Sequence, residues 1–536
     1  ARASTSHSYS HPPASLYPPN VMLRRAAFGA ALSAAACQLL FSFAGAEIAH
    51  RIAFGSCANP NHGGQIYELI ESFHPQHLVL LGDNIYVDHQ KIGTIAENFT
   101  AIMQHEYKVL EQLPAWQSLL HSVDTWSATY DDHDYGVNNA DKTFPHRKFA
   151  QQAFWEFARD SFEQGSDPTS QDAVYSAKTV RVPSILPNGD DFVYKLLMLD
   201  ARSNKDTSGT QGGDFLGSEQ WRWLAQELSD PAPQLVLVGS GIQVLTDDKL
   251  LEESWSEFPF ARERLLRYLT AASATADVVM LSGDIHRAEA NHASCRLESI
   301  EAVTGGAGAG GDFDDLLGAA AVLWEFTSSG LTHTLKQVLD RRPQGQQSSD
   351  SKAVPVRSRG VLFEIVDSIY QFAYPAFYRV DKCADHYSEL HFGLLDLVPA
   401  LSSDSSSDSS GNATVQSHGL SLDFSIISHR GERVISRSLP LGDFSDSSRV
   451  RNLAFLEYAQ SDAVLLRCEP ARGPLTLWRA LMFRAIIAAA LMLLLVLPAL
   501  MVLWFLAASI YYVAMGAEYT RRERIEAQFQ EHKKVL

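Results

Sequence analysis

The stretch HLVLLGDNIY (residues 77–86) places a short apolar run directly before a glycine, an aspartate, an asparagine and a tyrosine. A continuous apolar run of this length, closed by glycine, predicts a strand that is buried on both faces. Two later stretches repeat the design, TWSATYDDHDYG (125–136) and VVMLSGDIHRAE (278–289). Ligands of open α/β sheets bind beyond the carboxyl ends of the strands, so we expect the polar ends of these three stretches to converge.

Apolar runs alternate with helical patterns throughout residues 49–335. Buried strands between amphipathic helices predict an α/β sheet architecture. The expected strands are 50–56, 77–83, 125–131, 192–202, 234–241 and 277–284, and the expected helices are 63–73, 146–160, 217–229 and 260–272.

The region after residue 335 has a different composition. Residues 390–398 and 421–429 resemble two strands of a hairpin, separated by the low-complexity insert SSDSSSDSSG at 402–411. Residues 340–359 are polar and predict a second long loop. The sheet architecture is therefore expected to resume after an interruption.

Charge and cysteine content narrow the class of protein. Lys and Arg total 44 against 62 for Asp and Glu, a formal net charge of -18, which disfavours nucleic acid as a partner. The five cysteines include no CxxC pair, which argues against a zinc knuckle. One disulfide among Cys295, Cys383 and Cys468 is compatible with the sequence, which leaves its pairing open.

The N-terminal 46 residues predict a leader followed by a signal peptide. Met22 fits an initiator, two arginines follow it, and a small-apolar run leads to the A-x-A site at residues 44–46. Residues 1–21 are polar and rich in proline, which is typical of a translated leader or an extension. The alternative is an N-terminal membrane anchor.

The C-terminal region predicts a single transmembrane helix at residues 485–515. This segment carries no charge, and at about 1.5 Å per residue it is long enough to cross a hydrocarbon core of about 30 Å. Residues 461–484 would form the juxtamembrane segment and residues 516–536 a basic cytosolic tail. A signal peptide and one stop-transfer helix predict a type I membrane protein whose main domain is lumenal or extracellular.

Short motifs suggest the secretory pathway. The chain ends in KKVL, which resembles a dilysine retrieval signal and predicts contact with coat proteins and residence in the endoplasmic reticulum. The sequons at Asn98 and Asn412 predict N-glycosylation, and both lie on the expected lumenal side.

The polar strand ends contain the residue types of a metal site. Asp83, Asp132 and Asp284 would repel one another if they converged, unless cations neutralised them. His133 and His286 add nitrogen donors, and a mixed oxygen and nitrogen set suits transition metals, whereas all-oxygen positions suit a harder ion such as Ca²⁺.

Two further residues point to a softer or ferric ion. Cys57 ends a strand, and its thiolate is a metal ligand, although an isolated cysteine is more often a buried small apolar residue. Tyr86 lies three residues after Asp83, close enough to reach the same ion, and phenolate binds Fe³⁺ strongly. The alternative for Tyr86 is that it only caps the core.

The motifs FGSC, GDNIY, YDDHDYGVNNAD, LDAR and SGDIHRAE occur in this order and resemble the PhoD-like alkaline phosphatases. The resemblance covers residues 50–335, within an expected PhoD-like domain at 47–460. It implies a four-layer αββα metallophosphatase sandwich, related in design to purple acid phosphatases. It also implies a dinuclear or trinuclear centre of Fe³⁺ and Ca²⁺ and phosphomonoester or phosphodiester substrates.

The resemblance implies a role for each matching residue. Asp83 corresponds to the bridging carboxylate. The implied ferric ligands are Cys57, Tyr86 and His286, and the implied ligands of the second cation are Asp132, Asn138 and Asp284.

Other residues are implied to act on the substrate. His133 matches a histidine that protonates the leaving group, and Arg147 matches a phosphate-binding arginine. Asp200 and Arg202 of the LDAR motif are expected to be scaffold or to lie behind the ligands. Arg287 and His333 depart from the family pattern, and His333 is a weaker candidate for substrate contact.

These observations predict a metal-dependent phosphoric ester hydrolase that acts through metal-activated hydroxide. One alternative is a catalytically inactive lumenal receptor or trafficking adaptor that keeps the metal site as structure. Another alternative is a phosphodiesterase specific for lipid-linked phosphates near the membrane.

Overall fold

The computed structural model describes residues 48–87, 99–163, 171–186, 189–247, 253–300, 320–334, 377–379, 381, 384–399, 419–442, 453–471 and most of 485–535. All of them belong to the compact unit Ile48–Leu536. Several sequence predictions fall outside the described residues: the leader and signal peptide at 1–46, the sequons at Asn98 and Asn412, and the inserts at 340–359 and 402–411.

One sheet has six strands in the described part of the chain, in the order β13-β12-β11-β1-β2-β3. β1, β2 and β3 are parallel, whereas β11, β12 and β13 extend the sheet in antiparallel fashion. The pairing of β11 with β12 confirms the predicted hairpin. The strands are β1 His50–Gly55, β2 His77–Leu81, β3 Thr125–Thr129, β11 His391–Pro399, β12 Leu420–Ser428 and β13 Arg433–Pro440.

The other sheet has eight strands among the described residues, in the order β10-β8-β9-β7-β6-β5-β4, and β14 also pairs with β8. β5, β6, β7 and β9 are parallel, and the remaining strands are antiparallel to their neighbours. The strands are β4 Ser176–Val182, β5 Phe192–Met198, β6 Leu235–Ser240, β7 Asp277–Ser282, β8 Ala288–Ser299, β9 Ala321–Ser328, β10 His386–Tyr387 and β14 Val464–Pro470.

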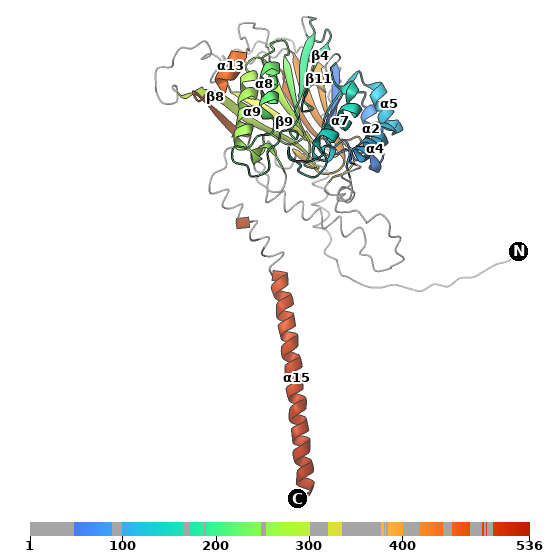
Figure 1. Cartoon of the computed structure of the whole chain (residues 1–536), viewed down its shortest axis with the longest axis vertical. Coiled ribbons are helices and arrows are strands. Elements are labelled where there is room, and N and C mark those ends of the chain that lie inside the picture. Colours follow the sequence, from blue (N-terminus) through green and yellow to red (C-terminus); the bar gives the residue numbers. More distant parts are fainter. Residues whose placement is uncertain are drawn as a thin grey trace, which may run out of the picture. The chain divides into compact units, whose positions relative to one another are not determined.

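Helices pack on both sheets (Figure 1). In α7, Ala150, Ala153, Phe154 and Phe157 are buried at helical spacing, so one face of the helix turns to the core. The longer helices of the domain are α2 Gln65–Glu71, α4 Phe99–Glu111, α5 Pro114–Ser122, α7 Arg147–Phe157, α8 Gly217–Leu228, α9 Pro259–Ala272 and α13 Leu453–Ala459. The short ones are η1 Pro60–His62, α6 Asp132–Tyr135, η2 Arg159–Ser161 and η4 Trp255–Glu257.

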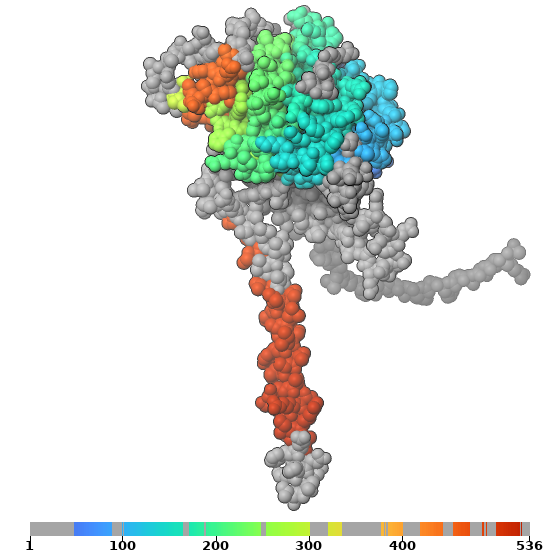
Figure 2. Space-filling view, viewed as in Figure 1, coloured from blue at the N-terminus to red at the C-terminus, as the bar shows by residue number. Residues whose placement is uncertain are grey.

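Three apolar cores hold these elements together. One core contains side chains from both sheets, and within it Phe326 and Phe424 stack with ring centroids 3.8 Å apart. A second core joins the six-stranded sheet to α2, α4, α5 and α7. A third core joins the eight-stranded sheet to α8, α9 and α13. Figure 2 shows α13 on the surface beside α8 and α9, although α13 is far from both in the sequence.

The expected mixed α/β fold with two multi-stranded sheets is confirmed. The six predicted apolar strands correspond to β1, β2, β3, β5, β6 and β7, and each ends before its polar motif. The predictions missed strands such as β4, β13 and β14, which have partly exposed, polar sequences. These strands pair in antiparallel fashion near the sheet edges, where one face can remain in water.

A disulfide joins Cys295 of β8 to Cys468 of β14, at positions directly opposite each other in the antiparallel pair. This disulfide gives the pairing that the sequence left open, and Cys383 lies outside the described residues. β14 is thereby bound covalently to the eight-stranded sheet.

α15 runs from Leu497 to Val535. By length and composition its segment Leu500–Ile525 is apolar enough to cross a membrane, and none of that window is buried against other residues. The predicted span at 485–515 overlaps this segment, and the helix continues through the predicted cytosolic tail instead of ending at residue 515.

Candidate metal centre

The polar motifs leave the sheets at the carboxyl ends of parallel strands, where the two sheets meet. Ser56, after β1, forms a parallel bridge with Ser329, after β9. The backbone N–H of Gly283, after β7, donates to the carbonyl of Gly241, after β6, at 3.0 Å. These contacts tie the ends of four strands from two sheets into one rim.

Four carboxylates gather at this rim: Asp83, Asp131, Asp132 and Asp284. One oxygen of each lies within 4.8 Å of the corresponding oxygen of the others. Asp83, Asp131 and Asp132 are each only 1% exposed. The structure therefore brings together the ends of β2, β3 and β7, as the sequence predicted, and we call this group the carboxylate cluster.

The carboxylate cluster can be fully ionised at neutral pH only when positive charge lies beside it. Burial, followed by repulsion from neighbouring acidic groups, raises the pKa of Asp83 and of Asp284 well above the ordinary range. Burial raises the pKa of Asp131 to about 7, although the Arg202 guanidinium acts in the opposite direction. Without bound cations, these carboxyl groups could not all ionise at neutral pH.

Asp132 differs from its neighbours because it is better stabilised as an anion. Burial acts to raise its pKa, but the charges of Arg202 and His133 bring it below the usual value. The backbone N–H of Asn139 also donates to Asp132 Oδ2 at 2.6 Å. Asp132 is thus the member of the carboxylate cluster most ready to bind a cation at neutral pH.

Open oxygen atoms in the cluster also fit cation binding. Asp131 Oδ2 and Asp132 Oδ1 are buried and have no hydrogen-bond partner among the described residues. Buried polar atoms are nearly always satisfied, so such oxygens need an explanation. Ligation of metal ions would explain them, and the set of carboxylates, imidazoles, thiol and phenol offers both hard and soft donors.

The backbone at the centre adopts an uncommon conformation. Cys57, Asp83, Asp284 and His286 have φ angles of 63°, 52°, 69° and 52°, all in the left-handed region. This region is unfavourable for residues other than glycine, and such strain tends to persist at functional sites. These tight turns point the side chains in directions that a continued strand would not allow, because side chains along a strand point only to the two faces of the sheet.

Cys57 and Tyr86 both contact Asp83. Tyr86 OH donates to Asp83 Oδ2 at 2.9 Å, and Cys57 Sγ lies 3.5 Å from the same oxygen. Burial raises the pKa of Cys57 to about 11, and burial together with Asp83 raises the pKa of Tyr86 well above its usual value. Both side chains are therefore neutral at pH 7 without a cation, and a cation beside them would favour their anions.

Two histidine rings contact the ring of Tyr86. The ring centroid of His133 lies 4.2 Å from that of Tyr86, and the ring centroid of His333 lies 4.5 Å from it. His333 also lies 4.7 Å from His286, centroid to centroid, and is 5% exposed. The backbone N–H of His133 donates to Asp83 Oδ1 at 3.2 Å, which fixes this histidine at the carboxylate cluster.

Two predicted site residues form no hydrogen bond or ion pair with the carboxylate cluster within the described residues. Asn138 is exposed, and it is the backbone of its neighbour Asn139 that contacts Asp132. Arg147 donates to the Ser203 carbonyl at 3.2 Å and lies 4.0 Å from Asp172. In the described part of the chain Arg147 forms no hydrogen bond or ion pair with the cluster, so its role in phosphate binding stays a prediction.

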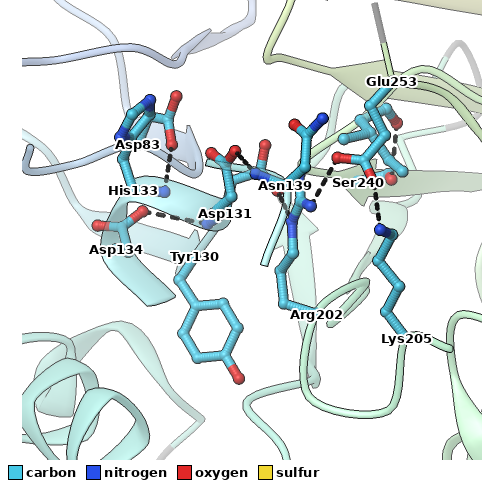
Figure 3. A network of polar contacts seen from close by, with 12 residues as sticks. Asp83, Tyr130, Asp131, His133, Asp134, Asn139, Arg202, Lys205, Ser240 and Glu253 are labelled. Carbon is cyan, nitrogen blue, oxygen red and sulfur yellow. Dashed lines mark hydrogen bonds and ion pairs between the residues drawn. The ribbon is translucent and has the colours of Figure 1, made fainter. Parts of the chain in front are cut away.

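Sequence reasoning missed several residues of the centre. Asp131 belongs to the carboxylate cluster, and the Asp131-Asp132 doublet was a signal that two acids leave β3 together. Figure 3 shows Asp131 between His133 and Arg202. Ser329 donates to or accepts from Cys57 Sγ at 3.0 Å, a contact between distant segments that no local motif indicates.

A family model described as PhoD-like phosphatase matches residues 52–367. The chain belongs to the PhoD-like phosphatase family. The resemblance that the motifs indicated is thereby confirmed. Family membership and the carboxylate cluster together support a metal-dependent phosphoesterase.

The chain is also similar to solved phosphatase structures. One is described as the structure of PhoD, with 17% identity, 73% of each chain covered and a TM-score of 0.42. Others are the purple acid phosphatase PPD1 from yellow lupin (Lupinus luteus) seeds and a dimetal phosphatase from Danio rerio. For the lupin protein the identity is 8%, the match covers 74% of this chain and 55% of the lupin chain, and the TM-score is 0.40. For the Danio rerio protein the identity is 10%, the match covers 74% of this chain and 100% of the Danio rerio chain, and the TM-score is 0.36. A search of curated proteins gave no match.

Proposed function

We propose that this PhoD-like protein hydrolyses phosphomonoesters or phosphodiesters at the carboxylate cluster, on the lumenal or extracellular side of a membrane. The observation that carries the proposal is the convergence of Asp83, Asp131, Asp132 and Asp284, with open buried oxygens, beside Cys57 and Tyr86. The proposed fold is the four-layer αββα metallophosphatase sandwich, which the three apolar cores support.

We assign the metal ligands as two groups that share Asp83. Cys57, Tyr86 and His286 suit Fe³⁺ because thiolate, phenolate and imidazole are strong ligands of that ion. Asp132 and Asp284 suit Ca²⁺, which prefers oxygen ligands, and Asn138 would join them after its exposed side chain turns toward the ion. When bound, such cations supply hydroxide near neutral pH and offset the charge that develops on the phosphoryl oxygens.

The chain's own residues would complete the chemistry. His133 is fixed by its backbone bond to Asp83 and by contact with the Tyr86 ring, so its imidazole is well placed to give a proton to the leaving oxygen. His333 lies over the same tyrosine and would contact the substrate. Arg147 would bind phosphate after a change of side-chain conformation from its present contact with Ser203.

The proposed compartment is the endoplasmic reticulum or another part of the secretory pathway. The Cys295–Cys468 disulfide supports this, because disulfides persist in oxidising compartments and are rare in the cytosol. The apolar segment of α15 supports single-pass anchoring. A type I orientation would leave the KKVL end in the cytosol, available to coat proteins.

The test is hydrolysis by the purified full-length protein in detergent. We expect turnover of p-nitrophenyl phosphate or bis-p-nitrophenyl phosphate when iron and calcium are supplied, and the preferred ester will show whether the enzyme favours monoesters or diesters. Asp83→Asn should lower kcat by roughly a thousandfold, because it removes the carboxylate that both ions would share. Folded, metal-loaded wild type that hydrolyses neither ester would rule the proposal out.

Arg147→Ala separates an enzyme from an inactive receptor or adaptor. An enzyme should lose turnover in this variant and keep its metal content. A receptor that keeps the metal site only as structure should have no turnover to lose in the wild type.

A further inference from the structure

A buried chain of charges lies directly behind the carboxylate cluster (Figure 3). Arg202 Nε donates to Asp131 Oδ1 at 2.5 Å, and Arg202 Nη1 donates to Glu253 Oε2 at 2.6 Å. The other carboxylate oxygen of Glu253 lies 2.7 Å from Lys205 Nζ. The side chains of Arg202 and Lys205 are 0% exposed, that of Asp131 is 1% exposed and that of Glu253 is 4% exposed.

The fold holds Asp131 tightly on its remaining sides. A Cβ on Gly82 would lie 2.5 Å from Asp131 Cβ, and Gly82 has a φ of 95°. A Cβ on Gly241 would lie 2.7 Å from Asp131 Cγ. Glycine at both positions lets the backbone approach this aspartate from two strand ends, so its carboxylate has little freedom to turn.

The LDAR motif follows the end of β5 and holds Arg202 in position. Asp200 Oδ1 accepts the backbone N–H of Arg202 at 2.9 Å and that of Ser203 at 2.8 Å. Asp200 Oδ2 accepts Tyr130 OH at 2.9 Å, and Tyr130 precedes Asp131 in the chain. The same aspartate therefore ties the arginine loop to the loop that carries two members of the carboxylate cluster.

We propose that Arg202, held by Glu253 and Lys205, is a positioning residue for the second cation of the centre. It fixes Asp131 so that this carboxylate stays with Asp83, Asp132 and Asp284, and it offsets one of their four negative charges. Arginine suits this role because it remains protonated when buried, and its planar guanidinium donates hydrogen bonds to Asp131 and Glu253 at the same time. The inference rests on the proposed function and adds a determinant of cation binding to it.

The experiment titrates Ca²⁺, and separately Mn²⁺, into metal-stripped full-length protein in detergent and measures affinity by calorimetry. Arg202→Met should weaken binding of the second cation by about 10- to 100-fold, as is usual when a residue that orients a ligand is lost. Arg202→Lys keeps the charge but not the fork and should recover part of the affinity. In activity assays Arg202→Met should lower kcat for bis-p-nitrophenyl phosphate with a much smaller change in KM.

Arg51→Met is the matched control. Arg51 forms a comparable two-point pair with Asp396, at 2.6 and 3.0 Å, near the start of β1 and far from its carboxyl end. This variant loses a partly buried ion pair, so its stability should fall, but its cation affinity should equal that of the wild type. A shared loss of affinity in both variants would overturn the positioning role.

Glu253→Gln tests the same inference if Arg202→Met does not fold. It leaves Arg202 and Asp131 in place and removes the charge that holds the guanidinium, so cation affinity should fall by about 10-fold. Folded variants at Arg202 or Glu253 with wild-type cation affinity would refute the inference and leave the proposed hydrolysis standing. If the wild type binds cations and hydrolyses neither ester, the proposed function fails, while weaker binding in Arg202→Met would still support the inference.

Discussion

Cys57, Asp83, Asp284 and His286 share a left-handed backbone conformation, and all four lie in the turns that follow β1, β2 and β7, in the region where the two sheets meet. Such conformations persist only when the surrounding structure enforces them. Here the enforcement comes from backbone bonds between strand ends, such as that from Ala58 N–H to the Asp83 carbonyl at 2.7 Å. The chemistry of each residue therefore depends on tertiary contacts as much as on its own side chain.

Tyr86→Phe tests the assignment of the ferric ligand. Iron-loaded wild type should show visible charge-transfer absorption from a tyrosinate bound to Fe³⁺. The variant keeps the ring that packs against two histidines but lacks the oxygen that contacts Asp83, so the band should disappear. An absorption spectrum of the two iron-loaded proteins checks this, and a colourless wild type would reject Tyr86 as the ligand.

His391 predicts a pH dependence of stability. Burial lowers its pKa to about 4, so it stays neutral in the folded protein while the unfolded chain binds a proton below about pH 6.5. The unfolded state then holds more protons, and the free energy of unfolding falls as pH drops through this window. Between pH 7 and pH 5 this histidine should account for a loss of roughly 2 kcal/mol.

The measurement is denaturant unfolding of full-length protein at pH 7 and at pH 5. His391→Asn can retain a hydrogen bond to the Glu389 carbonyl, which His391 Nδ1 makes at 2.7 Å, and it does not titrate in this range. The variant should therefore lose less stability than the wild type on acidification. Equal losses in the two proteins would contradict the prediction.

Individual strands differ in how well their sequences predict them. β2, HLVLL, is buried at every position and carries a continuous apolar run, so its periodicity predicts a central strand. β13, RVISRSLP, is mostly exposed or half-buried and mixes arginine and serine with apolar residues. Its pairing with β12 at the edge of the sheet was decided by tertiary context, which commonly outweighs local strand propensity.

At the scale of elements, the disulfide between β8 and β14 should be a substantial source of stability. It closes a loop across a sequence separation of 173, and loss of such a link typically costs about 2–5 kcal/mol. Cys468→Ser should therefore lower the Tm, and a reducing agent should lower the Tm of the wild type but not of the variant.

Cys57 provides an internal check on the disulfide experiment. It is the other cysteine among the described residues, and it is buried and unpaired. Because Cys468→Ser retains Cys57, an effect of reductant that persists in the variant would show that the disulfide is not its source.

At the scale of the whole molecule, the candidate membrane span in α15 does not pack against the phosphatase-family domain. None of the candidate span within α15 is buried against other residues, so its removal exposes no core. A chain ending at residue 471 should move from the membrane fraction to the soluble fraction and keep its kcat on p-nitrophenyl esters. Fractionation and activity assays check this, and a truncated protein that aggregates would show that α15 contributes to folding.

The sequence by itself determined the strands with continuous apolar runs, the order of the polar motifs, the family and the apolar C-terminal segment. These features are local: each depends on the composition or periodicity of a short stretch. Only the tertiary structure decided that Asp131 joins the carboxylate cluster, that Arg202 pairs with Asp131, that Ser329 contacts Cys57 and that Cys295 pairs with Cys468. Each of these contacts joins segments distant in the sequence, and their geometry follows from the packing of two sheets, which no single stretch encodes.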